Sequence, residues 1–410
     1  MPKKTQTSSL LKKIAEQVHS TTNIIENATL SPFATKSSEA FRLKKEKQDA
    51  LRTPFERDRH RVIFSDSYRG YRGRTQVFLL ANYHIADRMV HVNYVAQISR
   101  MLAKALKLNS DLAEAIAVTH DLGHAPFGHD GENILSDISQ EYKIGQFHHN
   151  VHSVRVVDFL EKQGKGLNLT FQVRDGTFSH DGEVHNVKLI PERKKTETKL
   201  QSDIDKLSQG KKVRSMPSTL EGCAMRISDT IAYIGSDIED AVKLNLIKIS
   251  DLPKVCLEKL GRTNGQIIDS IIADIIQNSY DHDYISFSDE ISEVVKILKE
   301  WNYKNIYLKF EERRSSFFHQ WQYQRKKVRD GMYKMFETFY NDIIHKNYES
   351  LIYRDFLNKM SSTYIKDKNN TPSIVTRDYI TTMTDEYATG VLEDILIPKP
   401  LFQVIEWKKK

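Results

Sequence analysis

Apolar residues recur at helical spacing along most of the chain, and this pattern predicts a mainly α fold. Between Ile85 and Ala105 the apolar side chains stand three or four positions apart, so one face of a helix can be buried. The polar run that begins at Asn109 contains residue types that start helices, and the next helix is expected to run toward His120. Further helices are predicted over Glu132–Ile138, Val151–Leu160, Pro217–Val242, Phe317–Ile344 and Arg377–Ala388.

Three segments depart from this pattern. Leu169–Val173 and Glu183–Leu189 alternate in polarity on either side of an Asp-Gly pair, which predicts a small β-hairpin insertion. Lys194–Arg214 is highly charged and holds almost no large apolar residue, so a mobile surface loop is expected there. Residues 1–50 are rich in Lys, Ser and Thr, with one amphipathic stretch near residues 10–18, and are expected to form a weakly packed basic arm.

Composition narrows the class of protein. With 410 residues, of which 39% are hydrophobic, the chain can build a sizeable core with appendages. The net charge of +7 favours an anionic partner, and nucleotide phosphates, nucleic acid or an acidic protein would each satisfy it. The chain lacks the run of about 18 apolar residues that a membrane span needs. The only cysteines, Cys223 and Cys256, lie far apart, which argues against a disulfide framework and for a reducing cytoplasm.

Candidate chemistry concentrates in residues 120–132. This stretch holds three histidines and three carboxylates in thirteen positions, among three glycines that allow sharp backbone turns. Burying so many polar groups is costly unless a metal or a phosphate compensates them, so a metal or phosphate site is the leading interpretation. A hydrogen-bonded helix cap is the alternative.

His120 and Asp121 are too few to bind a metal alone, so further ligands must come from elsewhere in the chain. His91 lies on a helix that should pack beside the helix leading to His120, and Asp229 lies in a largely apolar helix where a carboxylate is otherwise unfavourable. Two histidines and two aspartates suit a six-coordinate divalent ion that keeps positions open for water. Mn²⁺, Mg²⁺, Fe²⁺ or Co²⁺ fits this set better than closed structural zinc.

The split pattern of His91, His120-Asp121 and Asp229 resembles the HD-domain phosphohydrolases. Further blocks resemble one branch, the deoxynucleoside triphosphate triphosphohydrolases (dGTPase-like family), and they run in family order from about residue 57 to 389. The blocks are Tyr68-Arg69 with Arg74–Phe78 ("FRRLxxKTQVF"), Arg88–His91 ("RLTH"), His120–Glu132 ("HDxGHxPFGHxGE"), Phe147–Asn150 ("FxHN"), Ser228–Tyr233 with Asp237 and Asp240 ("ADxIAYxxxDxxD"), and Asp378–Asp385 ("DYIAGMTD"). Gly70, Tyr71, Thr382 and Glu386 depart from the family pattern, which leaves base specificity and effector regulation open.

The resemblance implies a helical HD-domain phosphohydrolase core. The expected organisation is a basic arm over residues 1–50 and the HD core over 51–245, with a charged insertion near 165–216. A helical C-terminal region over 246–410 would complete a nucleotide pocket and form oligomer contacts. The implied reaction hydrolyses a deoxynucleoside triphosphate, with dGTP favoured, to a deoxynucleoside and inorganic triphosphate.

The resemblance also implies roles for individual residues. His91, His120, Asp121 and Asp229 would hold one divalent ion, Mn²⁺ or Mg²⁺ first, with Fe²⁺, Co²⁺ and Zn²⁺ as alternatives. The proposed catalytic residues are His129, Glu132 and His149, with Glu132 orienting His129 so that the pair activates water or protonates the leaving oxygen. Substrate contacts are assigned to Gln76 and Asp237 at the 3′ hydroxyl, Tyr233 beneath the sugar, Arg88 and His124 at phosphate, and Tyr323 at the base, for which a place in the apolar core is the alternative.

Expected partners are a dNTP substrate, a dNTP effector, single-stranded nucleic acid and further copies of this chain, as a tetramer or hexamer. Two other functions compete with the leading one. An HD site can act on a nucleoside monophosphate, a cyclic nucleotide or an alarmone, although the residues matched at the sugar argue against this. A nucleic-acid-binding nucleotide sensor is the other alternative, which the basic chain ends permit.

Overall fold

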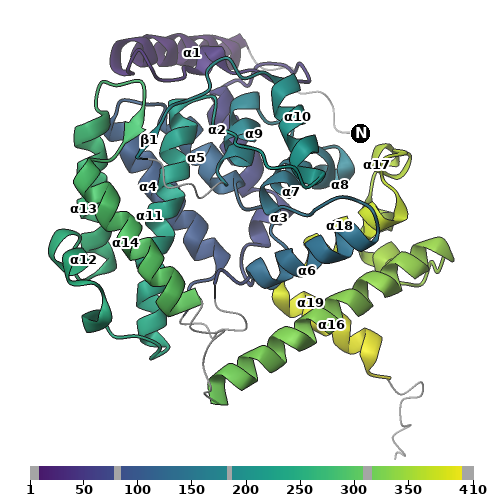
Figure 1. Ribbon diagram of the computed structural model, residues 1–410. Coiled ribbons are helices and arrows are strands. Elements are labelled where there is room, and N and C mark those ends of the chain that lie inside the picture. Colours follow the sequence, from purple (N-terminus) through teal and green to yellow (C-terminus); the bar gives the residue numbers. More distant parts are fainter. Residues whose placement is uncertain (1–8, 78–84, 182–186, 308–315, 399–410) are drawn as a thin grey trace, which may run out of the picture.

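Helices account for nearly all of the regular structure, as the apolar periodicity predicts (Figure 1). The computed structural model describes residues 9–77, 85–181, 187–307 and 316–398. The first helices are α1 (Ser9–Thr29), α2 (Pro54–Ile63), α3 (Asp66–Arg69), α4 (Arg88–Ala105), α5 (Ser110–Thr119), α6 (Gly128–Glu141), α7 (His149–Arg155), α8 (Glu161–Gly164), α9 (Phe171–Ser179), α10 (Glu197–Ser208) and α11 (Leu220–Lys243). They are followed by α12 (Lys254–Lys259), α13 (Asn264–Ser279), α14 (Asp289–Asn302), α16 (Ser316–Ile344), α17 (Ser362–Ile365), α18 (Pro372–Thr381) and α19 (Asp385–Leu396).

Shorter turns complete the backbone. The 3₁₀ turns are η1 (Ser37–Glu39), η3 (Ile249–Asp251) and η6 (Leu357–Lys359), and the π turns are η2 (Val156–Leu160), η4 (Tyr303–Tyr307) and η5 (Ile352–Phe356). The predicted helix over Val151–Leu160 therefore divides into α7 and the π turn η2, and the one over Arg377–Ala388 divides into α18 and α19. Among the residues described, no helix combines the length and the apolar character that crossing a bilayer requires.

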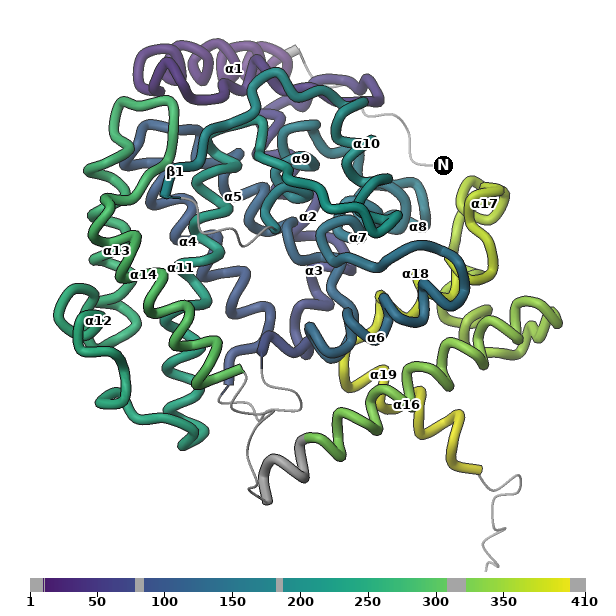
Figure 2. Tube along the Cα trace, in the orientation of Figure 1, coloured from purple at the N-terminus to yellow at the C-terminus, as the bar shows by residue number. Residues whose placement is uncertain are grey.

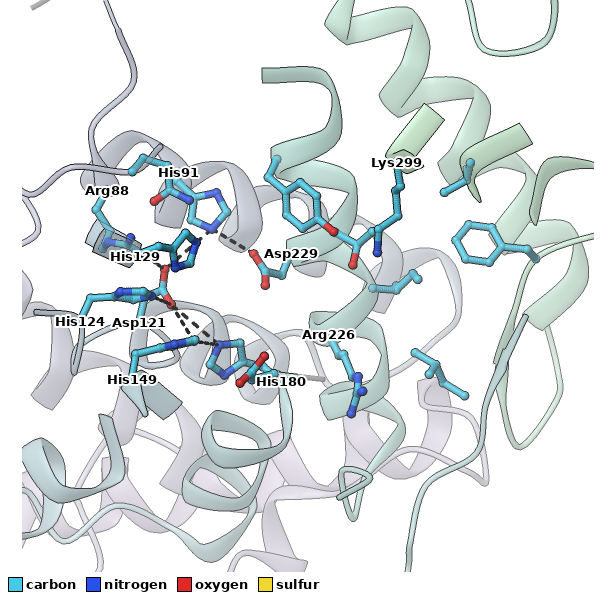
Figure 3. A pocket seen from close by; sticks show the side chains of 18 residues that line it. Arg88, His91, Asp121, His124, His129, His149, His180, Arg226, Asp229 and Lys299 are labelled. Atoms are coloured by element: carbon cyan, nitrogen blue, oxygen red, sulfur yellow. Dashed lines mark hydrogen bonds and ion pairs between the residues drawn. The ribbon is translucent and has the colours of Figure 1, made fainter. Parts of the chain in front are cut away.

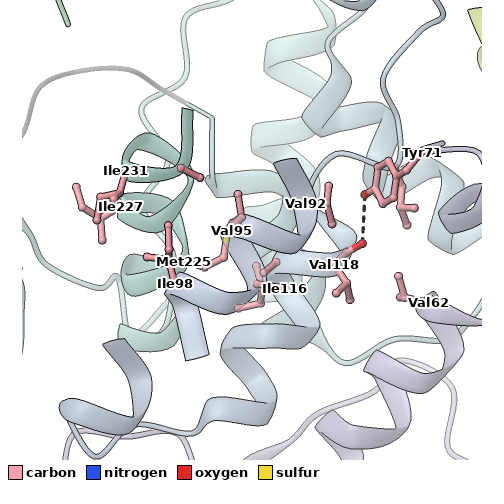
Figure 4. Close-up of a cluster of buried hydrophobic side chains, with 14 of the residues drawn as sticks. Val62, Tyr71, Val92, Val95, Ile98, Ile116, Val118, Met225, Ile227 and Ile231 are labelled. Carbon is pink, nitrogen blue, oxygen red and sulfur yellow. Dashed lines mark hydrogen bonds between the residues drawn. The ribbon is translucent and has the colours of Figure 1, made fainter. Parts of the chain in front are cut away.

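Helices α4, α5 and α11 pack against one another at the centre of the molecule (Figure 1). The residues between them include Val95, Ile116 and Met225, all fully buried (Figure 4). Helices α4 and α5 each begin after a residue whose side chain accepts a hydrogen bond from a backbone N–H in the first turn. These residues are Asp87 for α4 and Asn109 for α5, and Asn109 is the helix start that the sequence predicts. This packing brings together the first turn of α4, the C-terminal end of α5 and the middle of α11, from which the candidate site is built.

The expected β-hairpin is wrong in its pairing. A two-stranded antiparallel sheet is present, but β1 (Lys188–Leu189) pairs with β2 (Ile285–Ser286) and not with residues 169–173. Those residues lead into α9, where every residue from Gln172 to Ser179 is buried. A helix buried on all sides has no polar face, so its 3.6-residue period is absent from the sequence. Residues 183–186 of the expected second strand lie outside the described residues.

Two other expectations are corrected. The charged stretch 194–214 is not a loop throughout, since it contains α10, a helix that buries Leu200 in a small cluster with Val154 and Phe178. The arm over residues 1–50 is not weakly packed after α1, because Ala34 is buried and Arg42 forms an ion pair with the buried Asp58. In both places a few long-range contacts order a segment whose composition is polar.

Helices α16, α18 and α19 lie together on one side of the molecule, whereas α12, α13 and α14 lie on the opposite side (Figure 2). Helix α16 packs against α6, α18 and α19, so the C-terminal helices are joined to the helix over Gly128–Glu141. The two cysteines are free and buried, as expected for a chain without a disulfide framework.

Candidate active site

The four predicted metal ligands converge on one point between α4, α11 and the end of α5. His91 Nε2 lies 2.9 Å from Asp229 Oδ1, and His120 Nε2 lies 3.3 Å from Asp121 Oδ2. The remaining cross distances, His91 Nε2 to Asp121 Oδ2 and His120 Nε2 to Asp229 Oδ1, are both 3.9 Å. Residues separated by up to 138 positions in sequence thus place two nitrogen and two oxygen donors within reach of a single ion.

The chemistry of this donor set fits a divalent metal. His120 Nδ1 donates to the Ala117 carbonyl oxygen at 2.7 Å, which turns the lone pair of Nε2 into the cluster. That Nε2 is fully buried and has no hydrogen-bond partner in the described part of the chain. A buried imidazole nitrogen without a partner is costly, and a metal ion satisfies it.

Arg88 lies against this cluster and not on the surface. Its side chain is 1% exposed, and the guanidinium forms an ion pair with Asp121 Oδ2 and donates to the Thr75 carbonyl oxygen. Burial alone would raise the pKa of Asp121, but His120 and Arg88 hold it well below the usual range. Asp121 is therefore a carboxylate at neutral pH, as a metal ligand must be.

A second group of side chains lines the other side of Asp121 (Figure 3). Glu132 accepts hydrogen bonds from the backbone N–H of His149 at 2.8 Å and from His149 Nδ1 at 2.9 Å. Burial would lower the pKa of His149, but the Glu132 carboxylate raises it to about 10. His124 stacks on the ring of His149 with centroids 4.1 Å apart, and its Nε2 lies 3.4 Å from Asp121 Oδ1.

His129 stands at the mouth of the site. Its imidazole is 65% exposed and its Nδ1 lies 3.6 Å from Glu132 Oε2, so the predicted pair is brought together. Glu132 is nevertheless closer to His149 than to His129. The Glu132 carboxylate thus contacts the imidazoles of both His129 and His149, whereas the sequence analysis paired it with His129 alone.

His180 is a site residue that the sequence analysis missed. It follows the end of α9, its Nδ1 donates to the Thr177 carbonyl oxygen at 2.6 Å, and its Nε2 lies 3.1 Å from His149 Nε2. Burial lowers its pKa to about 4. His180 could have been noticed as a histidine next to the Asp181-Gly182 pair, but the hairpin prediction placed this part of the chain at a turn between two strands.

The cavity continues from the cluster toward α11 and α14. It is lined by Gln76, Tyr233 and Lys299 in addition to the histidines, and Lys299 Nζ lies 5.8 Å from the centre of the Tyr233 ring. The buried Asp237 accepts a hydrogen bond from Tyr307, and burial raises its pKa to about 7. Gln76 and Tyr233 thus face the cavity together, while Asp237 lies one turn further along α11, beyond the cavity lining.

Tyr323 is not brought to this cavity within one chain. Its side chain on α16 is 59% exposed, and Lys327 Nζ lies 4.5 Å from the centre of its ring. Core burial, the alternative interpretation of this residue, is wrong.

Comparison with known proteins matches residues 88–232 to the HD domain. The chain is 35% identical over 389 residues to a deoxyguanosinetriphosphate triphosphohydrolase-like protein of Caldanaerobacter subterraneus subsp. tengcongensis, covering 94% of this chain and 98% of the relative. Proteins of the same name from Clostridium perfringens strain 13 and Desulfatibacillum aliphaticivorans are 34% and 31% identical, over 94% and 91% of this chain and 98% and 96% of theirs.

The chain belongs to the deoxyguanosinetriphosphate triphosphohydrolase-like family. It is a helical HD-domain hydrolase, and the predicted resemblance is confirmed.

Family motifs that are distant in sequence meet at the turn after α5, which begins with the proposed metal ligands His120 and Asp121. The fully buried guanidinium of Arg74 donates to four backbone carbonyl oxygens, two on that turn and two near the C-terminus, namely Leu122, His124, Thr381 and Met383. Asp385 accepts from the backbone N–H groups of Thr75 and Phe127 at 3.0 and 2.8 Å. These two side chains tie the end of α18 and the start of α19 to the turn, a connection we call the C-terminal clamp.

Proposed function

We propose that this protein hydrolyses a deoxynucleoside triphosphate, with dGTP favoured, to a deoxynucleoside and inorganic triphosphate. The observation that carries this proposal is the convergence of His91, His120, Asp121 and Asp229 beside a cavity that Gln76 and Tyr233 line. The names of the relatives support the same substrate class.

The four converging residues would hold one divalent ion, with Mn²⁺ or Mg²⁺ favoured. Such an ion supplies neutralisation of phosphate charge and a lowered pKa for water in its vicinity. The fully buried, unpartnered His120 Nε2 supports the assignment.

In the proposed reaction, water attacks the α-phosphorus, the bond between phosphorus and the 5′ oxygen breaks, and that oxygen leaves with a proton. Arg88 and His124 would hold phosphate oxygens, since both line the cavity next to Asp121. His129, oriented by Glu132, would protonate the leaving oxygen or accept the proton of the attacking water. His149, whose Nδ1 also bonds Glu132, would contact phosphate or transfer a proton.

The sugar would lie against Tyr233, where a ring beneath C2′ leaves no room for a 2′ hydroxyl. Gln76 and Asp237 would bond the 3′ hydroxyl. Gln76 Oε1 is buried and lacks a hydrogen-bond partner in the described residues, which supports its part of this assignment. Asp237 would first have to exchange its hydrogen bond with Tyr307.

The test is to incubate purified protein with each dNTP and Mn²⁺ or Mg²⁺ and to resolve the products by ion-exchange chromatography. We expect deoxynucleoside and triphosphate. Orthophosphate or pyrophosphate would reject the reaction type. Turnover of only nucleoside monophosphates, cyclic nucleotides or alarmones in the same assay would transfer the site to that substrate class.

The proposal extends to a cytoplasmic homo-oligomer, a tetramer or hexamer, in which a second dNTP acts as effector and Tyr323 contacts the base. Light scattering that gives the 47.5 kDa monomer would reject the oligomer. Salt-dependent binding of single-stranded oligonucleotides would identify nucleic acid as a further regulator.

A further inference from the structure

We propose that Arg226 is a further substrate-binding residue, which holds the terminal phosphates of a nucleotide and so makes the site select a triphosphate over shorter phosphate chains. The inference rests on the proposed function, because it starts from a nucleotide bound at the proposed metal ligands. Arg226 has none of the roles assigned above, and it precedes the family block over Ser228–Tyr233.

Helix α11 carries its proposed nucleotide contacts in the order of the parts of a nucleotide. Tyr233, proposed at the sugar, lies one turn after Asp229, proposed at the metal, and Arg226 lies about one turn before it. Residues at this spacing share one side of a helix, and all three line the cavity. Figure 3 shows Arg226 farther from His91 than Asp229 is.

This order gives the direction of the phosphate chain. A sugar at Tyr233 and an α-phosphate beside Asp229 direct the β- and γ-phosphates toward Arg226. Helix α11 rises by about 10 Å between Arg226 and Tyr233, at about 1.5 Å per residue. A deoxyribose followed by three extended phosphates can span that length.

The Arg226 guanidinium is a buried cation in the wall of the cavity. The residue is 9% exposed, and its Nη1 donates to the carbonyl oxygens of Ser179 at 2.8 Å and Ser215 at 2.9 Å. Both acceptors are neutral, so these bonds orient the guanidinium without neutralising it. A buried positive charge is stabilised by an anion, and the N–H groups of a guanidinium match the spacing of phosphate oxygens.

A second buried cation fixes the backbone that orients Arg226. The Lys195 side chain is fully buried, and its Nζ donates to the hydroxyls of Ser179 at 2.8 Å and Ser215 at 2.6 Å. Lys195 also forms an ion pair with the buried Asp175 at 2.5 Å. Lys195 and Arg226 thus bridge the same two residues, one before His180 and one before α11, and a side chain held in this way loses little entropy when it binds a ligand.

The surroundings strengthen the attraction between Arg226 and an anion. The cavity is also lined by four buried apolar side chains, those of Leu189, Ile227, Phe287 and Val295. Apolar walls exclude water, and charges attract each other more strongly where water is excluded. Asp181 and Asp229 line the cavity as well, so charge balance within the protein is the alternative role for Arg226 that the experiment must separate.

The experiment measures binding in the full chain, independently of turnover. Isothermal titration calorimetry at a fixed concentration of free Mn²⁺ gives dissociation constants for two probes. One is inorganic triphosphate, and the other is a phosphonate analogue of dGMP in which a methylene group replaces the 5′ oxygen, so that it cannot be hydrolysed. Arg226→Met removes the charge, and Arg226→Lys keeps it without the fork of N–H groups. Arg193→Met, which removes an exposed arginine paired with Asp283 outside the cavity lining, is the matched control.

We expect Arg226→Met to raise the dissociation constant for inorganic triphosphate about 10- to 100-fold, the range for loss of a hydrogen bond to a charged group. Arg226→Lys should raise it about 3- to 10-fold. The constant for the phosphonate should change less than about twofold, because its one phosphate lies at the metal and Arg88. Arg193→Met should change neither constant. Thermal melting shows whether each variant is folded.

Unchanged triphosphate binding in folded Arg226→Met would assign Arg226 to charge balance and overturn the inference. Equal weakening of both probes, or a wild type that binds no triphosphate, would overturn it as well. If Arg226→Met does not fold, the same two constants for Arg226→Lys decide the question. A wild type that binds triphosphate through Arg226 but releases no deoxynucleoside from any dNTP would overturn the proposed function and leave the phosphate contact intact.

Discussion

At the residue scale, the site consists of imidazoles whose orientation is set by neighbouring oxygens. Glu132 is the carboxylate that does this for His129 and His149, and it contacts no metal ligand among the four proposed. We therefore propose that Glu132 is a positioning residue.

We predict that Glu132→Gln lowers kcat for dNTP hydrolysis by about 10²- to 10⁴-fold, the range that a positioned acid or base contributes. KM should change less than about threefold, because the phosphate and sugar contacts remain. Steady-state kinetics checks this. The control is Asp137→Asn on the same helix, whose carboxylate pairs with Arg329 in an ion pair about half exposed to solvent. Equal losses of kcat in the two variants would contradict the assignment.

Tyr233 is predicted to set the preference for deoxyribose. In Tyr233→Ala the space beneath C2′ opens, so the ratio of kcat/KM for dGTP over GTP should fall about 10- to 100-fold. Tyr233→Phe keeps the ring and should keep the ratio. The measurement is competition between the two nucleotides in one reaction, and an unchanged ratio in the alanine variant would refute the role.

The sequence could predict most of the site at this scale. His91, His120, Asp121 and Asp229 are recognisable because carboxylates and histidines are unusual on apolar helical faces and because their order matches a family. His180 carries no such mark, since it follows a helix whose buried polar residues resemble a strand and a turn. Its partner His149 lies 31 positions earlier, and only the packing of α7 against α9 brings them together.

At the element scale, close contact between α7 and the turn after α5, which begins at His120 and Asp121, depends on Gly123. A Cβ added there would lie 2.1 Å from the backbone nitrogen of Ser153 and 2.6 Å from the carbonyl oxygen of His149. Backbone atoms cannot yield as a flexible side chain does, so any larger residue must push the turn and the helix apart.

We predict that Gly123→Ala destabilises the protein by about 1–3 kcal/mol and lowers its affinity for Mn²⁺. Urea unfolding and metal titration measure the two effects. Gly265→Ala is the control, since its Cβ would meet no atom within 4 Å and α13 should gain up to about 1 kcal/mol from the better helix former. Equal stabilities of the two variants would show that the turn can relax.

The helices that the sequence predicts well are those with one buried face. Helix α4 runs within the predicted range, and α5 begins where Asn109 indicates. Helices α9 and α10 were missed for opposite reasons. The first is buried on every side, so it has no polar face for periodicity to detect. The second has only a narrow apolar stripe of Leu200, Ile204 and Leu207, which the surrounding charged residues hide in the sequence.

At the scale of the whole molecule, buried ion pairs join the C-terminal region to the HD core. Asp378 on α18 is fully buried and accepts hydrogen bonds from Arg155 Nε at 2.7 Å and Arg155 Nη2 at 2.6 Å. Burial alone would raise the pKa of Asp378, but the Arg155 guanidinium lowers it below the usual value.

We predict that Asp378→Asn costs about 3–5 kcal/mol of unfolding free energy at pH 7, because it leaves Arg155 without its charged partner. The pKa of Asp378 is lower in the folded than in the unfolded state. The contribution of its ion pair to the unfolding free energy is therefore fully present above about pH 4 and is lost as the pH falls through the folded-state pKa of Asp378. Urea unfolding of both proteins from pH 7 to pH 3 measures the difference. Asp283→Asn, which breaks an exposed pair with Arg193, should cost less than about 1 kcal/mol. A difference that stays constant with pH would contradict the ionised pair.

The C-terminal clamp also has a consequence for how the enzyme matures during synthesis. The ribosome makes the turn with His120 and Asp121 long before it makes residues 381–385. Only then can Arg74 bind the carbonyl oxygens of Thr381 and Met383, and Asp385 bind the backbone N–H of Phe127. A nascent chain therefore carries its proposed metal ligands without the backbone support that aligns them. For the proposed hydrolysis of dNTPs, activity would arise only after the last helices emerge, so incomplete translation products would not deplete the cell's DNA precursors.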